Sequence, residues 1–113
     1  MKTYTGGCHC GLVRFTAELD LEKTITCNCS HCGKKGFILS ATPKEKFTLE
    51  QGADAQKEYF FNKNAIRHLF CTTCGTQSYS EGVEFPGMMV NVRCLDDVDT
   101  DTLSPERYNG KDI

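Results

Sequence analysis

At 113 residues the chain is long enough for one domain and too short to divide comfortably into two, so we expect residues 1–113 to fold as a single domain. Acidic and basic residues are mixed along the chain and leave a net charge of −2, which excludes the basic stripe of a nucleic-acid-binding protein. No apolar leader opens the chain and no run of about 18 apolar residues could span a membrane, so we expect a cytoplasmic protein without a membrane partner.

The predicted fold class is mainly β, with strands joined by turns. Residues 12–17 come first, and their alternation places Val13, Phe15 and Ala17 on one face, which is typical of a half-buried strand. Further strands are predicted at residues 37–41, 47–49, 76–80 and 88–92. Helix is expected only as single turns, near residues 43–46 and 97–103.

A hairpin is predicted in the middle of the chain. Residues 58–61 and 65–70 flank Asn62-Lys63-Asn64, where asparagine can take the left-handed conformation of a tight turn. The aromatic residues of this hairpin are expected to be core residues rather than a binding site. They are Tyr59, Phe60, Phe61 and Phe70.

Seven of the eight cysteines fall into three clusters along the chain. A reducing compartment favours metal ligation over disulfides, and a disulfide between residues two apart would be strained. We therefore expect zinc, with iron ligation and disulfides as the alternatives. The clusters are Cys8-His9-Cys10, the stretch CNCSHC from Cys27 to Cys32, and Cys71-Thr72-Thr73-Cys74.

Four of these cysteines are predicted to form a closed structural zinc site. In an extended chain the side chains of Cys8 and Cys10 point to the same face. Cys71 and Cys74 have the spacing of a metal-binding knuckle, and Gly75 after them can adopt positive φ. Structural zinc contributes on the order of 10 kcal/mol of folding free energy, which would help a small core.

The remaining three, Cys27, Cys29 and Cys32, predict an open zinc site. Three thiolates leave the fourth tetrahedral position to water or a ligand, which is typical of a reactive site. An incoming thiol would bind there and arrive as a nucleophilic thiolate. The chain would thus hold two zinc ions, one structural and one open, with these three cysteines as the catalytic residues.

One alternative is a second closed site, completed by His9, His31, His68 or Cys94. His31 lies between two expected ligands, and we interpret it as a solvated or hydrogen-bonding group that points away from the ion. Cys94 has no cysteine near it in the sequence, and is interpreted as a small buried hydrophobic residue.

Basic residues next to the open site are candidates for substrate binding. Lys34 and Lys35 follow the triplet between two glycines and predict a flexible basic turn that could hold an anionic substrate. A solvated basic turn without a ligand is the alternative. Arg93, at the end of a predicted strand, is a further candidate for the same task.

Together these motifs resemble a known family. They are Gly7-Cys8-His9-Cys10-Gly11 before a Val-Arg-Phe strand, CNCSHC, RHLFCTTCG at residues 67–75, and VNVRCLD at residues 90–96. In this order they are similar to the glutathione-dependent formaldehyde-activating enzymes, a family that also includes centromere protein V. The resemblance runs from Gly7 to the closing Tyr108-Asn109-Gly110-Lys111-Asp112-Ile113.

The resemblance implies a zinc-bound fold of small packed antiparallel sheets, called a β-tent. It also implies a structural zinc on Cys8, Cys10, Cys71 and Cys74 and a catalytic zinc on the triplet. The family's activity joins formaldehyde to glutathione to give S-hydroxymethylglutathione and is classed as a carbon-sulfur lyase. The family often has a basic or small polar residue directly after the triplet, where this chain has Gly33.

Two functions from different classes follow from these observations. In the first, the chain is an enzyme that activates a thiol, glutathione by resemblance, for addition to a small aldehyde such as formaldehyde. In the second, it is a non-catalytic zinc- or thiol-binding module, in which a site with three protein ligands releases its ion readily and acts as a carrier or sensor. The sequence does not specify the substrate or the oligomeric state.

Overall fold

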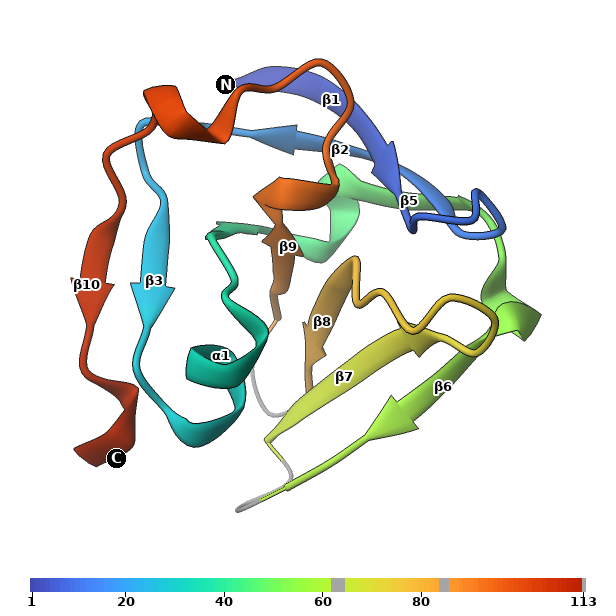
Figure 1. Ribbon diagram of the computed structural model, residues 1–113. Coiled ribbons are helices and arrows are strands. Elements are labelled where there is room, and N and C mark those ends of the chain that lie inside the picture. The colour runs from blue at the N-terminus through green and yellow to red at the C-terminus, as the bar shows by residue number, and fades with distance from the viewer. Residues whose placement is uncertain (62–64, 84–85, 113) are drawn as a thin grey trace.

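The computed structural model describes residues 1–61, 65–83 and 86–112, which form ten strands in two sheets (Figure 1). The first sheet has three antiparallel strands in the order β1-β2-β5. Its strands are β1 (Lys2–Gly7), β2 (Arg14–Leu19) and β5 (Phe47–Gln51). The mainly β fold class predicted from the sequence is therefore confirmed.

The second sheet has seven strands in the order β10-β3-β4-β9-β8-β7-β6. Its neighbouring strands are antiparallel except β10 and β3, which run parallel. In chain order its strands are β3 (Ile25–Cys27), β4 (Leu39–Thr42), β6 (Gln56–Tyr59), β7 (Ile66–Cys71), β8 (Tyr79–Gly82), β9 (Met88–Asn91) and β10 (Glu106–Tyr108).

The alternation of the first predicted strand is confirmed, although β2 begins two residues later than predicted. Phe15, Ala17 and Leu19 are buried, and they pack against residues of β9 and of the segment before β4. Because every second side chain of β2 faces the same way, one face of the small sheet covers the large sheet. This layer of apolar side chains forms the first of two core clusters.

The predicted hairpin is confirmed as the antiparallel pair β6 and β7, while its turn at residues 62–64 lies outside the described residues. The predicted strand at residues 76–80 is partly wrong, since β8 begins at Tyr79. Gln77 and Ser78 come before it and remain buried. Thr76 still belongs to the turn that contains Cys71 and Cys74, because its carbonyl accepts a hydrogen bond from the Cys71 N–H.

Helix was expected from the sequence only as single turns near residues 43–46 and 97–103. The structure also contains the helix α1 (Ser30–Lys35), which was not predicted. Cys29 is its N-cap, with Sγ accepting from the N–H of Cys32, and Gly36 ends it with φ 70°. Lys34 and Lys35 therefore form the last turn of a helix and not a flexible turn. The predicted single turns are observed at Lys44–Lys46 and Thr100–Thr102, with others at Ala53–Ala55, Val92–Cys94 and Gly110–Asp112.

In the described residues, no helix has the length and apolar character needed to cross a membrane.

Candidate metal centres and adjoining cavities

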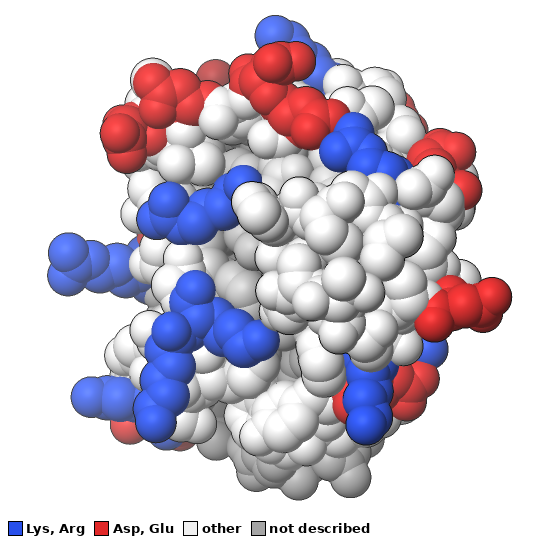
Figure 2. Space-filling model, turned by 45° about the vertical axis from the view of Figure 1, so that its right-hand side comes forward, with Lys and Arg blue, Asp and Glu red and all other residues white. Residues whose placement is uncertain are grey.

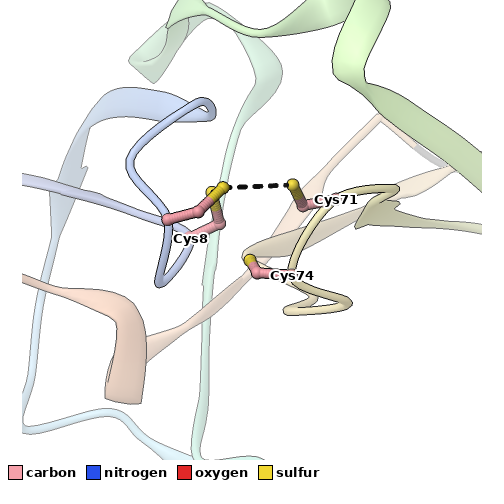
Figure 3. A group of neighbouring side chains, drawn as sticks. Cys8, Cys71 and Cys74 are labelled. Carbon is pink, nitrogen blue, oxygen red and sulfur yellow. Dashed lines mark hydrogen bonds between the residues drawn. The ribbon is translucent and has the colours of Figure 1, made fainter.

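The first centre brings together Cys8, Cys10, Cys71 and Cys74, as the spacing predicted. All four Sγ atoms lie within 4.8 Å of one another, and Cys10 Sγ is 3.6 Å from the Sγ atoms of both Cys8 and Cys71. Figure 3 shows Cys8 facing Cys71 and Cys74 across the gap between two turns of the chain. Two segments more than sixty residues apart thus meet at this four-cysteine centre.

The chain is folded locally to aim these sulfurs at one point. The N–H groups of Val13 and Thr73 donate to the sulfurs of Cys8 and Cys71, at 3.3 and 3.4 Å. Gly75 follows the knuckle with φ 80°, as the sequence predicted, and its N–H donates to the Cys71 carbonyl at 2.8 Å. Hydrogen bonds from Thr76 lower the pKa of Cys74 to about 5, which favours a thiolate.

These four residues fit a zinc ion. With Zn–S bonds of about 2.3 Å, tetrahedral geometry places the sulfurs roughly 3.8 Å apart, close to the 3.6 Å separations observed. Cys8 and Cys71 are buried members of the second core cluster, which also contains Val13, Leu69 and Tyr79. A metal held there would therefore join two distant segments inside the core.

The second centre consists of Cys27, Cys29 and Cys32, whose Sγ atoms also lie within 4.8 Å of one another. Cys27 is the last residue of β3, Cys29 caps α1, and Cys32 lies in the first turn of α1. This three-cysteine centre is built from six consecutive residues. Each sulfur is half-buried, unlike those of Cys8 and Cys71.

The thiols of the second centre influence one another's ionisation. Burial raises the pKa of Cys32, and the neighbouring sulfurs of Cys29 and Cys27 raise it further. Burial opposes ionisation of Cys29, yet its pKa is lowered because the Cys32 N–H and neighbouring thiols donate to its sulfur. Three thiolates this close repel one another, so a donor set of this kind fits a divalent cation such as zinc.

The C-terminal segment closes one side of the three-cysteine centre. Tyr108 is in register with Cys27 in the parallel pair of β10 and β3, and the N–H of Asn28 donates to the Tyr108 carbonyl. The Asn28 side chain also bonds Asn109 and the N–H of Lys111. At Gly110 a side chain would overlap Cys27 Sγ, so only glycine allows this approach.

An apolar cavity of about 400 Å³ opens directly on the three-cysteine centre. The sulfurs of the triplet line it on one side, and His68, Ser80 and Tyr108 supply polar groups. Its apolar lining residues are Ile25, Phe37, Leu39, Phe61, Ile66 and Met89.

A second hollow of about 590 Å³, which we call the cationic pocket, adjoins the apolar cavity at Phe61, a lining residue of both. Lys34 and Lys35 from α1 line it, and the Lys35 ammonium lies 6.0 Å from the centre of the Phe70 ring. Figure 2 shows lysine and arginine side chains gathered on one side of the molecule, with most acidic groups elsewhere on that face.

The hairpin aromatic residues were wrongly expected to be core residues. Tyr59, Phe61 and Phe70 line the cationic pocket, and Phe60 is exposed. Strand β6 is at the edge of the large sheet, so these aromatic side chains lie over the pocket, while Leu69 of β7 packs in the second core cluster. The number of aromatic residues in this hairpin was the sequence feature that could have indicated a binding pocket.

The sequence interpretation made His31 a solvated or hydrogen-bonding group. It is instead partly buried and packs among aromatic rings. Its ring centre is 4.1 Å from that of His68 and 5.2 Å from that of Phe61, and its Nδ1 is buried without a hydrogen-bond partner in the described residues. Burial lowers the pKa of His68 to about 4, with further contributions from His31 and Lys35, so this ring is neutral at pH 7. Gln77 Nε2 lies 3.1 Å from its Nδ1.

The remaining candidates lie outside both centres. Arg93 donates to the carbonyl of Gly36 at 3.0 Å, and so touches the end of α1. Cys94 packs against the first core cluster, and burial raises its thiol pKa to about 11. In the described part of the chain, the triplet is joined by none of the four residues considered as a fourth ligand: His9, His31, His68 and Cys94. The second closed site is therefore not formed in the described residues.

The two sheets hold a four-cysteine centre, which is partly buried, and a three-cysteine centre, which opens on a cavity. These features define a small β protein with two candidate metal sites. The chain belongs to the family of glutathione-dependent formaldehyde-activating enzymes, whose model matches residues 3–109. The resemblance seen in the sequence is thereby confirmed.

The fold is shared with a Rhodobacter sphaeroides protein known from a crystal structure. The two chains superpose with a TM-score of 0.85 and are 28% identical, over 92% of this chain and 99% of that one. The likeness thus covers most of this chain and nearly all of that one.

Proposed function

We propose that this protein is a zinc-dependent carbon-sulfur lyase-like enzyme of the cytoplasm. It activates a thiol, glutathione by family membership, for addition to a small aldehyde such as formaldehyde. The observation that carries the proposal is the three-cysteine centre, whose sulfurs converge within 4.8 Å and line a cavity. A purely structural centre has no need of such access.

The residues that would hold the two zinc ions are the four cysteines of the first centre and the three of the second. When bound to the three thiolates, zinc would supply a fourth ligand position and lower the pKa of a thiol that occupies it. The chain itself keeps the triplet in place: the Cys32 N–H orients Cys29, and the C-terminal segment supports Cys27.

The cationic pocket is the proposed site for the body of the thiol substrate. Glutathione carries two carboxylates and one ammonium group, so it has a net negative charge at pH 7. Lys34 and Lys35 line the pocket and supply point charges for those carboxylates. Arg93 remains a candidate for the same role, although its bond to Gly36 also lets it support the end of α1.

The proposed reaction forms one C–S bond. The thiol sulfur adds to the aldehyde carbon, the C=O double bond becomes a single bond, and the proton of the thiol is transferred to the aldehyde oxygen. No oxidant or reductant is needed. His68 lines the cavity, and burial lowers its pKa to about 4, so this side chain adds no charge there at pH 7.

Exchange spectroscopy by NMR on glutathione and formaldehyde tests this function. We expect the zinc-loaded protein to accelerate exchange between free glutathione and its hydroxymethyl adduct well above the uncatalysed rate. Cys29→Ser should abolish the acceleration. Cys94→Ser is the matched control, since Cys94 belongs to neither centre, and should retain it.

Equal exchange rates with and without the protein would contradict the proposed enzyme. Release of one zinc ion on a modest rise in glutathione, without catalysis, would instead identify a metal carrier or sensor.

A further inference from the structure

The apolar cavity is much larger than formaldehyde requires. Its volume is about 400 Å³, whereas a cavity of roughly 150 Å³ lined by leucine, isoleucine and phenylalanine already holds a benzene ring. A one-carbon aldehyde and a metal ion would leave most of this space without a partner. Because the cavity is open to solvent, apolar lining that no ligand covers stays in contact with water, so the lining favours a ligand that buries it.

The lining of the cavity is also wrong for a charged ligand. Ile25, Ile66 and Met89 present hydrocarbon and thioether surface, and no lysine, arginine, aspartate or glutamate lines the cavity in the described residues. A carboxylate or ammonium group would lose hydration there without gaining a partner of opposite charge. The charged parts of glutathione therefore belong in the cationic pocket, which carries Lys34 and Lys35.

Each hollow thus suits a different substrate: the cationic pocket suits the charged thiol, and the apolar cavity suits the carbonyl compound. They share Phe61, and only the apolar cavity is lined by the three sulfurs. A thiol whose charged body lies in the cationic pocket would reach the triplet past Phe61, the residue that lines both hollows. The apolar cavity then remains for the substituent on the carbonyl carbon.

Resting on the proposed function, we propose that the carbonyl substrate is an aldehyde with an apolar body of about six carbons, as in a medium-chain aliphatic or aromatic aldehyde. Its carbonyl group lies beside the triplet, where His68 and Ser80 are polar neighbours, and its hydrocarbon body packs against Ile66 and Met89. The sulfur adds to the carbonyl carbon and the thiol proton is transferred to the carbonyl oxygen, giving a longer S-(1-hydroxyalkyl) adduct.

Calorimetric titration of the zinc-loaded protein with S-methylglutathione and S-hexylglutathione measures the binding preference directly. Both probes are stable, and they differ only in the apolar group on sulfur. Each methylene buried from water strengthens binding up to about fourfold. We expect S-hexylglutathione to bind at least tenfold more tightly, and equal affinities would overturn the inference.

Two variants that make the lining polar locate the effect in the cavity. Met89→Gln keeps the side-chain size, and Ile66→Thr removes one heavy atom; both add a polar group to the lining, so each should reduce the hexyl-to-methyl preference several-fold. Leu12→Ser is the matched control, because Leu12 is exposed and lines no part of this cavity. The preference must survive in Leu12→Ser, and circular dichroism verifies that each variant is folded.

Exchange spectroscopy with hexanal and with formaldehyde separates this inference from the proposed function. Acceleration with hexanal at least tenfold greater than with formaldehyde supports both. Acceleration with formaldehyde alone overturns the inference and leaves the proposed function standing. Tighter binding of the hexyl probe without acceleration of any aldehyde overturns the proposed function, and with it the assignment of the cavity's occupant as a substrate.

Discussion

Cys71 and Cys29 are both expected zinc ligands, but they are placed differently in the chain. Cys71 is buried in a core cluster and meets cysteines from the first turn of the chain, whereas the cysteines that Cys29 meets are two and three residues away in sequence. Loss of a ligand costs stability in proportion to how far the metal ties distant segments together. The two serine variants should therefore differ.

Cys71→Ser should lower the free energy of unfolding by several kcal/mol and reduce soluble expression, because a hydroxyl is a weak zinc ligand. Cys29→Ser should keep most of the wild-type melting temperature. Thermal unfolding followed by circular dichroism compares them. Equally large losses in the two variants would mean that the clusters share their metals differently.

Gly110 lies against Cys27, where an added methyl group would overlap the sulfur and come within 3.3 Å of Cys29 Cβ. Gly110→Ala should displace Cys27 and weaken zinc binding at the three-cysteine centre by about 10–100-fold, as expected when the support of a ligand is lost. Competition with a chromophoric chelator measures this affinity. The first centre should keep its ion.

Gly33→Ala is the matched control for that variant. Gly33 lies within α1, and an added Cβ would meet only the Asn28 carbonyl at 3.9 Å. Alanine is favoured over glycine in a helix by up to about 1 kcal/mol. Its zinc affinity should match the wild type or exceed it, and a loss as large as that of Gly110→Ala would argue against a specific role for the C-terminal segment.

At the scale of elements, the ion pair of Arg14 and Asp96 ties the small sheet to the segment that follows β9. Asp96 also accepts from the Thr5 hydroxyl, and its N–H donates to the Thr5 carbonyl. Hydrogen bonds from Arg14 and Thr5 hold the pKa of the Asp96 carboxyl below its ordinary value. A depressed carboxyl pKa stabilises the fold above the unfolded-state pKa of about 3.9.

Asp96→Asn should lower the free energy of unfolding by roughly 0.5–1 kcal/mol at pH 7, because the pair is partly exposed. The difference from wild type should stay constant from about pH 8 to pH 5 and disappear as the pH falls through the depressed carboxyl pKa. Urea unfolding across this range measures it, with the exposed Asp54→Asn as control. A difference that grows on acidification would refute the assignment.

The elements differ in how well the sequence predicts them. The alternation of β2 can be recognised in the sequence because one face of the strand is buried and the other is more exposed. Helix α1 is hidden because it is six residues long, contains a glycine and is capped by a cysteine sulfur rather than a usual capping side chain. Periodicity detects neither short helices nor caps that come from metal-binding residues.

At the scale of the whole molecule, the division into four and three cysteines could be predicted because each cysteine cluster is a short motif with recognisable spacing. The contribution of the C-terminal residues to the three-cysteine centre could not be predicted. Tyr108 and Gly110 reach the site through the parallel pairing of β10 with β3, whose residues are about eighty positions apart. Nothing in a single sequence specifies such a long-range parallel contact.

Removal of zinc should unfold the protein partly or wholly. A chain of this size buries only about 65% of its unfolded surface, so its stability margin is small without a cross-link between Cys8 and Cys71. Circular dichroism after strong chelation should show loss of the β signal, and re-addition of zinc should restore it. An unchanged melting curve with zinc verified as absent would exclude a structural role.

The division into two centres is tested most directly by the zinc content of the wild type and of Cys29→Ser, purified without chelator and measured by elemental analysis. The geometry of the two cysteine groups predicts two ions per chain in the wild type and one in the variant. One ion in the wild type, or none in the variant, would contradict an open three-cysteine centre that is independent of the closed one.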